Sequence, residues 1–262
     1  MKRFAVLGSP IEHSLSPVLH NFLYKKLDLQ AEYDRFEVKQ GELKDFLALH
    51  NSEEWWGLSL TMPLKEEGMR HCDSLAAEAL ETSSINTLKR VTSGWTGYNT
   101  DVFGFRFLIE RIAGAGGPKE YEDVSILGAG GTARAALVAL RDSGKKAKVF
   151  RRNSERDQSL LRANRDIEII DWSEASRAFD SAVIINCAPA DAMSSITSNA
   201  QCRGFLLDSL YSPWPTPLMR VSDSKFFSGK DLLVAQAIQQ FEVFFDISLE
   251  HDSIFTELRA LI

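Results

Sequence analysis

The sequence predicts an α/β protein made of two α/β domains, and three observations lead to this prediction. Short apolar segments typical of strands alternate with segments of helical spacing along the chain. A glycine-rich turn that joins a strand to a helix begins only at Gly128. The hundred or so residues before it therefore form a separate domain with a different function, most simply substrate binding. A length of 262 residues, of which 44% are hydrophobic, is enough for two modest domains with buried cores.

The segments before the glycine-rich turn predict the first domain. Strand-like or extended segments of four to seven residues indicate strands, and apolar residues three or four positions apart indicate helices. We expect the strands to form a mixed sheet. The predicted strands are 4–7, 32–38 and 56–60, the helices are 17–27, 42–49, 65–72 and 75–80, and a hairpin joins 87–91 to 94–99 around Thr92 and Ser93.

Repeated strand and helix units predict that the second domain is a Rossmann domain. The segment IAGAGGP at 112–118 is the best linker signal on the chain. We set the domains at 1–101, completed by 237–262, and 102–236. The predicted strands are 123–127, 148–150, 167–170, 182–186 and 204–207, and the helices begin at 128, 231 and 253.

Composition excludes several classes of protein. A net charge of −6 and a pI near 5.5 argue against nucleic-acid binding. The apolar run at 4–7 is too short for a signal peptide, and no apolar segment is long enough to span a bilayer. Three cysteines without a CxxC pair indicate reduced, buried thiols. The five histidines lack metal-ligand spacing, so we expect them at the surface or partly buried. We expect a cytoplasmic monomer or homodimer that binds a small molecule, with no metal, membrane or nucleic-acid partner.

The turn after the strand at 123–127 has the pattern of a dinucleotide site. Gly128, Gly130 and Ala133 form G-x-G-x-x-A at a strand end and a helix start. In this pattern the first glycine permits the tight turn, the second lets the backbone approach a pyrophosphate, and the alanine allows close helix packing. The helix N-terminus favours the anion. The alternative is a glycine-rich turn that is only structural.

Arginines stand where a site specific for NAD has an acidic residue, about 20 residues after the glycines. The segment at 150–156 reads FRRNSER. Guanidinium groups would pair with a 2′-phosphate and would leave a bare ribose diol without a partner, so we favour NADP over NAD. The alternative is a solvated basic loop.

Six short motifs in sequence order resemble those of the shikimate dehydrogenase family, NADP-linked enzymes that interconvert 3-dehydroshikimate and shikimate. Their order is more specific than any one of them, and they extend over nearly the whole chain. The motifs are HSLSP at 13–17, LTMPLKE at 60–66, SINT at 84–87, NTD at 99–101, GAGGTAR at 128–134 and LVAQA at 233–237. The resemblance implies an NADP(H)-dependent oxidoreductase of aromatic amino acid biosynthesis.

The resemblance also implies ligand-binding residues. Ser14 and Ser16 would bind the substrate carboxylate, and Tyr211 would close the pocket. Because Gln236 lies in the C-terminal helical tail, the resemblance also implies that the last helices pack back on the first domain and complete its site. The alternative for the two serines is that Ser16 only caps the helix that Pro17 begins. The implied substrate-binding residues are Ser14, Ser16, Ser59, Thr61, Asn86, Tyr211 and Gln236, and the implied cofactor-binding residues are Gly128, Ala129, Gly130, Gly131, Thr132, Ala133, Arg151, Arg152, Asn153, Arg156, Ala188 and Gly229.

Lys65 and Asp101 match the catalytic pair of the family. Hydride transfer at a secondary alcohol needs a group that takes or gives the hydroxyl proton. Asp101 would orient the ammonium and bind the reacting hydroxyl, while Lys65 handles the proton. Burial under the cofactor would favour the neutral amine and pairing with Asp101 the charged one, and the sequence leaves both open. Without the resemblance, Lys65 indicates only a solvated helix face.

Three positions depart from the family pattern. Ser59 stands where asparagine is usual, Asp231 where glycine is usual, and Ala188 lies in an altered segment beside the cofactor. These changes leave two other functions open. One is an enzyme that prefers quinate or a similar hydroxylated ring acid, and the other is a regulator that senses NADP without catalysis.

Overall fold

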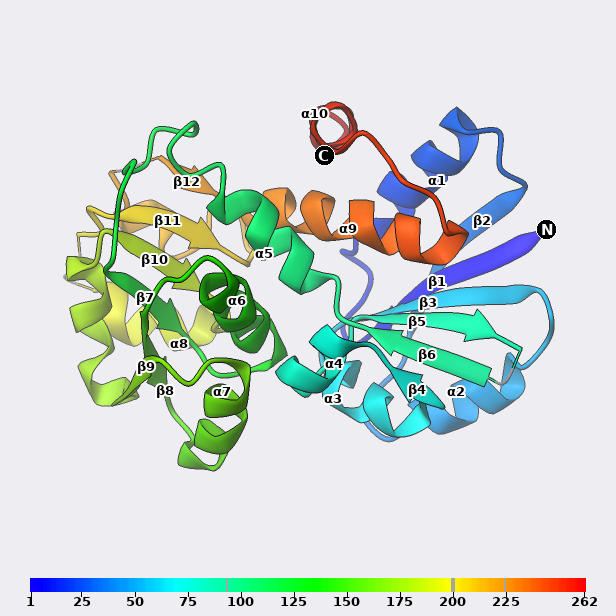
Figure 1. Ribbon diagram of the computed structural model, residues 1–262, viewed down its shortest axis with the longest axis horizontal. Helices are drawn as coiled ribbons and strands as arrows, with labels where there is room; N and C mark the ends of the chain where they lie inside the picture. The colour runs from blue at the N-terminus through cyan, green and yellow to red at the C-terminus, as the bar shows by residue number, and fades with distance from the viewer. Residues whose placement is uncertain (93, 199–200, 224) are drawn as a thin grey trace. The chain divides into compact units, whose positions relative to one another are not determined.

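The computed structural model describes residues 1–92, 94–198, 201–223 and 225–262. The chain forms two compact units, residues 1–100 with 236–262 and residues 101–235 (Figure 1). Both junctions fall one residue before those expected from the sequence. Asp101 therefore belongs to the second unit and Gln236 to the first. The linker signal at 112–118 lies inside the second unit, so its interpretation as a domain boundary was wrong.

The first unit contains a mixed sheet of six strands in the order β2-β1-β3-β5-β6-β4. Its first three strands in this order are parallel, whereas β5 is antiparallel to both of its neighbours. Ser93, in the turn of the predicted hairpin, lies outside the described residues. The strands are β1 (Lys2–Gly8), β2 (Ala31–Glu37), β3 (Trp55–Leu60), β4 (Ser74–Leu75), β5 (Thr87–Val91) and β6 (Gly94–Tyr98).

Helices pack on this sheet, and two of them, α9 and α10, come from the C-terminal end of the chain. A Cβ at Gly57 of β3 would lie 2.4 Å from the Phe244 ring, and the rings of Phe4 and Phe244 are 4.9 Å apart, so the last long helix packs directly on the sheet. Leu75, predicted as helical, is instead in β4, because it pairs with Gly97. The helices are α1 (Ser16–Lys26), α2 (Leu43–Leu49), α3 (Leu64–Glu67) with a 3-10 turn (Gly68–His71), α4 (Ala77–Thr82), α9 (Gly229–Phe245, of which the first unit holds the part from Gln236) and α10 (His251–Arg259).

The second unit contains a parallel sheet in the order β12-β11-β10-β7-β8-β9. The strand order reverses between β7 and β10, as in a Rossmann fold, and the carboxyl ends of the strands meet at one edge. The predicted fold class is confirmed. The elements are α5 (Asp101–Ile109), β7 (Val124–Leu127), α6 (Gly131–Asp142), β8 (Ala147–Arg151), α7 (Asp157–Ala163), β9 (Ile167–Asp171), β10 (Val183–Asn186), α8 (Ala190–Thr197), β11 (Phe205–Asp208) and β12 (Phe226–Phe227), with 3-10 turns at Ser154–Arg156, Trp172–Asp180 and Met219–Val221.

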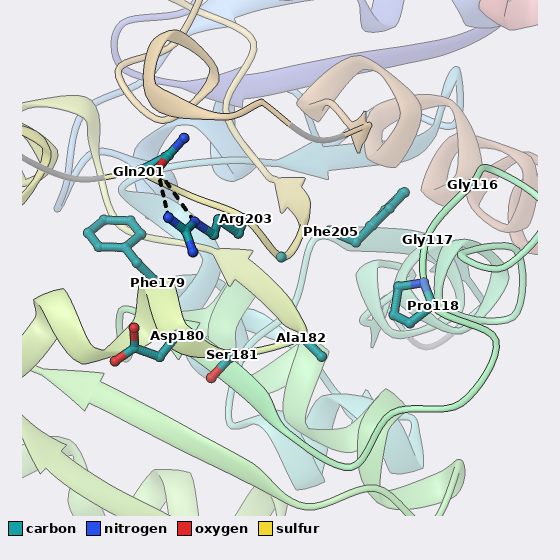
Figure 2. A pocket seen from close by; sticks show the side chains of 11 residues that line it. Gly116, Gly117, Pro118, Phe179, Asp180, Ser181, Ala182, Gln201, Arg203 and Phe205 are labelled. Carbon is teal, nitrogen blue, oxygen red and sulfur yellow. Dashed lines mark hydrogen bonds between the residues drawn. The ribbon is translucent and has the colours of Figure 1, made fainter.

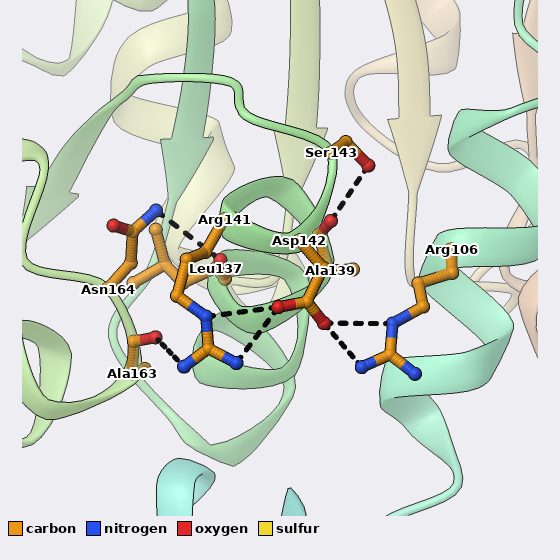
Figure 3. A network of polar contacts seen from close by, with 8 residues as sticks. All are labelled: Arg106, Leu137, Ala139, Arg141, Asp142, Ser143, Ala163 and Asn164. Carbon is orange, nitrogen blue, oxygen red and sulfur yellow. Dashed lines mark hydrogen bonds and ion pairs between the residues drawn. The ribbon is translucent and has the colours of Figure 1, made fainter.

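A polar network fixes α5 against α6 (Figure 3). The Arg106 guanidinium donates to one carboxylate oxygen of Asp142 from Nε at 3.0 Å, and Arg141 donates to the other oxygen at 2.9 and 3.0 Å. Arg141 also donates to the Ala163 carbonyl at the end of α7, at 3.3 Å. These bonds hold the helix that begins at Asp101 within the second unit.

No described helix combines the length and apolar composition that crossing a bilayer requires.

Candidate active site

One edge of the first sheet gathers the polar turns of this unit. The carboxyl ends of β1 and β3 meet the amino end of β5 there, and Ser59 pairs in register with Thr87. The turn after β1 packs on the turn after β3, because a Cβ at Gly8 would lie 2.3 Å from the Thr61 methyl group. The HSLSP turn is thereby brought to the same edge as Thr61.

Ser14 and Ser16 are both buried at the start of α1. The N-cap position is Leu15, which makes no side-chain capping bond, and the Ser14 hydroxyl accepts from the Ser16 N–H at 3.4 Å. Ser16 therefore does not act as the simple N-cap considered above.

Backbone hydrogen bonds join the segment of Lys65 to that of Asn86. The Ile85 N–H donates to the Lys65 carbonyl at 2.9 Å, and the Leu60 N–H donates to the Asn86 carbonyl at 2.8 Å. Lys65 is the second residue of α3 and is half-buried, whereas Asn86 is buried. The predicted proton-transfer residue thus lies beside a predicted substrate-binding residue in the same unit.

Hydrogen bonds hold both ends of the Asn86 side-chain amide. Its Oδ1 accepts from the Thr100 N–H at 2.9 Å and from the Thr87 hydroxyl at 2.8 Å. Its Nδ2 donates to the Thr100 hydroxyl at 2.9 Å and to Gln236 Oε1 at 3.3 Å. Asn86 and Gln236, predicted separately from distant motifs, are therefore in direct contact.

A second buried group surrounds Ser59. Its hydroxyl donates to Gln240 Oε1 at 2.6 Å and is in short contact with the Tyr33 hydroxyl. His20 Nε2 also bonds to Gln240 Oε1 at 3.1 Å, and its ring stacks on Tyr33 with centroids 4.3 Å apart. Burial lowers the pKa of His20 to about 3, so the imidazole is neutral at physiological pH. Burial also raises the pKa of Tyr33, which stays protonated.

Sequence reasoning missed His20, Tyr33, Thr87 and Gln240, and it placed the histidines at the surface or only partly buried. His20 is wholly buried. Two of these residues could have been predicted from helical periodicity. His20 follows Ser16 by four residues on α1, and Gln240 follows Gln236 by four on α9, so each lies one turn away on the same face.

Asp101 and Tyr211 lie in the second unit. Asp101 is buried at the start of α5, directly after Thr100. Tyr211 follows β11 in a loop held by Asp208, whose carboxylate accepts from the Thr216 hydroxyl at 2.5 Å and the Leu210 N–H at 3.0 Å. Burial raises the pKa of Asp208, and these hydrogen bonds oppose that effect. Burial also raises the pKa of Tyr211.

The predicted cofactor-binding turn of residues 128–133 joins β7 to α6. Gly128 has φ +113°, and a Cβ there would lie 3.0 Å from the Cys187 carbonyl, so both conformation and space require glycine. A Cβ at Gly130 would meet no atom of the described residues within 4 Å. Gly130 is the N-cap of α6, whose first turn carries Gly131, Thr132 and Ala133. This open cradle at a helix N-terminus fits a pyrophosphate.

The arginines after β8 differ in their surroundings. Arg151 donates to Asp157 at 2.8 Å and to Asp171 at 2.9 Å, so two carboxylates engage it. Arg152 is exposed and lies 5.9 Å from the centre of the Trp172 ring. Asn153 accepts from the Glu155 N–H at 2.9 Å and caps the turn that contains Arg156. Arg151 is the last residue of β8, and Arg152, Asn153 and Arg156 follow it, at the same sheet edge as the glycine-rich turn.

The remaining predicted cofactor-binding positions are close to backbone turns. Ala188 follows β10, and its N–H donates to Asn186 Oδ1 at 3.0 Å. A Cβ at Gly229 would lie 2.5 Å from the Ser209 carbonyl oxygen, so glycine lets α9 begin against the Tyr211 loop. The Asp231 carboxylate accepts from the N–H and hydroxyl of Ser228, at 2.7 and 2.6 Å. It therefore turns back to cap α9.

A cavity of about 730 Å³ opens at the opposite edge of the parallel sheet (Figure 2). Its lining includes Ser181 and Ala182 before β10, and Arg203 before β11. The Arg203 guanidinium donates to Gln201 Oε1 at 3.2 Å. This cavity therefore lies at the amino ends of the strands. Ligands of open α/β sheets bind at the carboxyl ends, which is where the predicted cofactor-binding turn of residues 128–133 lies.

The three cysteines are free thiols, and only Cys202 is buried, so the expectation of three buried thiols was wrong in part. Within the described part of the chain, no group of three His, Cys, Asp or Glu side chains is arranged to hold a metal ion.

Comparisons with known sequences find relatives over nearly the whole chain. Residues 6–88 match a family model described as the shikimate dehydrogenase substrate binding domain. A shikimate dehydrogenase (NADP(+)) of Ignicoccus hospitalis is 32% identical over 98% of both chains. A pentafunctional AROM polypeptide of Candida tropicalis is 33% identical over 97% of this chain and 18% of its own. The chain thus spans less than a fifth of that larger relative.

Solved structures show the same fold. The crystal structure of Mycobacterium tuberculosis shikimate dehydrogenase superposes with a TM-score of 0.84, at 33% identity, over all of both chains. Shikimate 5-dehydrogenase of Thermus thermophilus, in complex with NADP(H) and shikimate, gives a TM-score of 0.79 at 26% identity, again over both whole chains.

Proposed function

The chain belongs to the shikimate dehydrogenase family, and we propose that it interconverts 3-dehydroshikimate and shikimate with NADP(H). This reaction belongs to the biosynthesis of aromatic amino acids by way of chorismate. One observation carries the proposal: the polar edge of β1, β3 and β5 joins Ser59, Asn86 and Gln236 through buried hydrogen-bonded side chains. Such an edge suits a small ring acid with several hydroxyl groups.

We assign the substrate contacts residue by residue. Ser14 and Ser16 hold the carboxylate with their hydroxyl groups, and Thr61, Asn86 and Gln236 hold hydroxyl groups or the carboxylate. Tyr211 closes the pocket from its loop after β11.

Lys65 and Asp101 carry the proton chemistry. Lys65 takes the hydroxyl proton when shikimate is oxidised and returns it when 3-dehydroshikimate is reduced. Asp101 orients the Lys65 side chain and binds the reacting hydroxyl. General acid and base groups of this kind contribute about 10²- to 10⁴-fold to a rate.

The second unit offers the residues for the cofactor. NADP(H), when bound, supplies or accepts the hydride. The turn of residues 128–133 holds the pyrophosphate by backbone N–H groups and the N-terminus of α6, and Gly130 leaves room for it. Arg152, Asn153 and Arg156 meet the 2′-phosphate, with Arg151 in a supporting position because two carboxylates engage it. Ala188 and Gly229 complete the nicotinamide side.

We further propose that the protein works in the cytoplasm as a monomer or homodimer. Size-exclusion chromatography with light scattering tests the oligomeric state.

An absorbance assay of the reduced nicotinamide tests the function. Shikimate and quinate are each crossed with NADP and NAD, and we expect turnover with shikimate and NADP. Turnover with quinate but not with shikimate would show that the protein is a quinate dehydrogenase. This is the alternative suggested by Ser59, which stands where the family usually has asparagine. NADPH binding without turnover of either acid would indicate a regulator.

The variant Lys65→Ala tests the proposed chemistry. We expect kcat to fall about 10²- to 10⁴-fold with the Kd for NADPH unchanged, because only proton transfer is lost. Lys44→Ala, which removes an exposed lysine of α2 in the same unit, is the matched control. Unchanged turnover in Lys65→Ala would overturn the assignment.

A further inference from the structure

Gln240 makes every hydrogen bond of which its side-chain amide is capable. Its Oε1 accepts from the Ser59 hydroxyl at 2.6 Å and bonds to His20 Nε2 at 3.1 Å. Its Nε2 donates to the Thr87 hydroxyl at 2.6 Å and to the Asn86 carbonyl at 3.3 Å. An amide has two donors and two acceptor lone pairs, so all four are in use. Gln240 itself is only 1% exposed.

The surroundings fix which way this amide points. The Asn86 backbone carbonyl can only accept, so the nitrogen of Gln240 must face it and the oxygen must face Ser59 and His20. His20 therefore carries its proton on Nε2, and its Nδ1 has no hydrogen-bond partner among the described residues. The direction of each neighbouring hydrogen bond follows from this one orientation.

On one side the network continues from Gln240 through Ser59 to Tyr33 of β2. The Ser59 hydroxyl gives its single proton to Gln240, so the Tyr33 hydroxyl must give its proton to Ser59. Tyr33 and Ser59 therefore both give their single hydroxyl protons inside the network.

On the other side the network continues toward Gln236. The Thr87 hydroxyl accepts from Gln240 and donates to Asn86 Oδ1 at 2.8 Å, where the Thr100 N–H also donates. Asn86 must then present its nitrogen to Gln236 Oε1, at 3.3 Å. The oxygen of Gln236 is engaged as an acceptor, so the nitrogen is the donating end of this amide.

We propose that Gln240 is a positioning residue that, through Thr87, holds the Asn86 amide so that Gln236 turns its amide nitrogen, as a donor, toward an oxygen atom of the ring acid. This inference rests on the proposed function. Gln240 touches no substrate; it acts through Thr87 and Asn86. A ligand that offers an oxygen lone pair to Gln236 is favoured over one that must donate there.

Thr87 gives the sharpest test, because it is wholly buried and links Gln240 to Asn86. Thr87→Val keeps the shape and removes the hydroxyl, while Thr87→Ser keeps the hydroxyl. We expect Thr87→Val to raise the KM for shikimate about tenfold with a smaller change in kcat, as for one buried hydrogen bond left unmade. Thr87→Ser should restore the wild-type KM, and the KM for NADP should stay within about twofold in both.

Gln240→Glu provides a second measurement. The carboxyl group keeps the size of the amide but loses at least one of its two donors, so the KM for shikimate should again rise at least about tenfold. If this variant fails to fold, as judged by thermal unfolding, the two Thr87 variants still decide the question.

The outcomes separate the two levels of the proposal. Wild-type protein that does not turn over shikimate with NADP would overturn the proposed function. Active wild-type protein with an unchanged shikimate KM in Thr87→Val, or an equal rise in the KM for shikimate and NADP, would overturn only the role of Gln240. A KM that stays raised in Thr87→Ser would do the same, because packing rather than the hydroxyl would then be responsible.

Discussion

The two sheet edges that we propose as ligand sites are built on different principles. At the edge of β1, β3 and β5, side chains are joined to one another, and Gln240, Asn86 and Ser59 each bond to at least two others. At the carboxyl edge of the parallel sheet, the turn of residues 128–133 relies on backbone conformation. Gly128 has a positive φ, and Gly130 leaves open space.

This difference indicates how each edge recognises its ligand. A saturated network of buried side chains has a fixed direction of donors and acceptors, so a change at one residue alters its neighbours. A glycine-rich turn before a helix offers N–H groups to an anion without the help of particular side chains. The first edge should therefore be sensitive to lost hydroxyl and amide groups, and the second to added carbon atoms.

Gly130→Val should give the largest effect and tests the backbone edge directly. Its φ of −79° and ψ of −173° suit any residue, and the position is open, so the free energy of unfolding should change by less than about 1 kcal/mol. The added methyl groups would fill the pyrophosphate cradle. We expect the Kd for NADPH to rise about 100-fold, equivalent to roughly two charge-assisted hydrogen bonds, as measured by fluorescence titration.

Gly128→Ala is the matched comparison. At φ +113° and against the Cys187 carbonyl, alanine should cost about 1–3 kcal/mol of stability as well as cofactor affinity. Normal NADPH binding by Gly130→Val would contradict the placement of the pyrophosphate.

The pH dependence of the free energy of unfolding tests the side-chain edge, because His20 is buried within it. Its pKa of about 3 lies below the ordinary 6.5, so the unfolded chain binds the extra proton between these values. Stability from this group is complete above about pH 6.5 and falls as the pH is lowered toward 3, by about 1.4 kcal/mol per unit. At pH 5 we expect a loss of about 2 kcal/mol in urea unfolding.

His20→Gln separates this effect from the titration of carboxylates, because glutamine places an uncharged amide near the Nε2 position. The variant should lack the loss between pH 6.5 and 5. Parallel curves for the two proteins would mean that His20 accepts a proton within the fold.

The sequence predicts the backbone edge better than the side-chain edge. Gly128 and Gly130 act through local conformation, so a motif between one strand and one helix reveals them. The segment at 75–80 shows the limit of local pattern, because pairing with Gly97 makes Leu75 a strand residue. Such pairing depends on residues far along the chain.

The network residues show a different limit. Tyr33, Ser59 and Gln240 come from three distant segments, and nothing in the sequence near Tyr33 indicates that its hydroxyl meets Ser59. Only the family resemblance pointed to Ser59, and it described a missing asparagine. The structure adds that Ser59 is a link between Tyr33 and Gln240.

Arg152→Ala should have a moderate effect that sharpens the account of the cofactor edge. Loss of its guanidinium should raise the KM for NADP about tenfold and leave the KM for NAD unchanged, because only the 2′-phosphate contact is lost. Arg151→Ala removes the same charge one residue away and is the matched control. Since Asp157 and Asp171 engage Arg151, we expect a smaller rise there. An equal rise in both variants would mean that net charge, rather than a specific contact, selects NADP.

Asp231→Ala should have the smallest effect, since it tests whether an unusual residue near the cofactor edge serves the fold. Its carboxylate accepts from the Ser228 N–H at 2.7 Å, the pattern of a capping box at the start of α9. We expect a loss of about 1 kcal/mol in the free energy of unfolding with no change in the Kd for NADPH. Asp231→Asn keeps an acceptor and should recover most of that loss. If Asp231→Ala instead tightened NADPH binding without loss of stability, the carboxylate would act on the cofactor by charge, and the cofactor edge would depend on side chains as the substrate edge does.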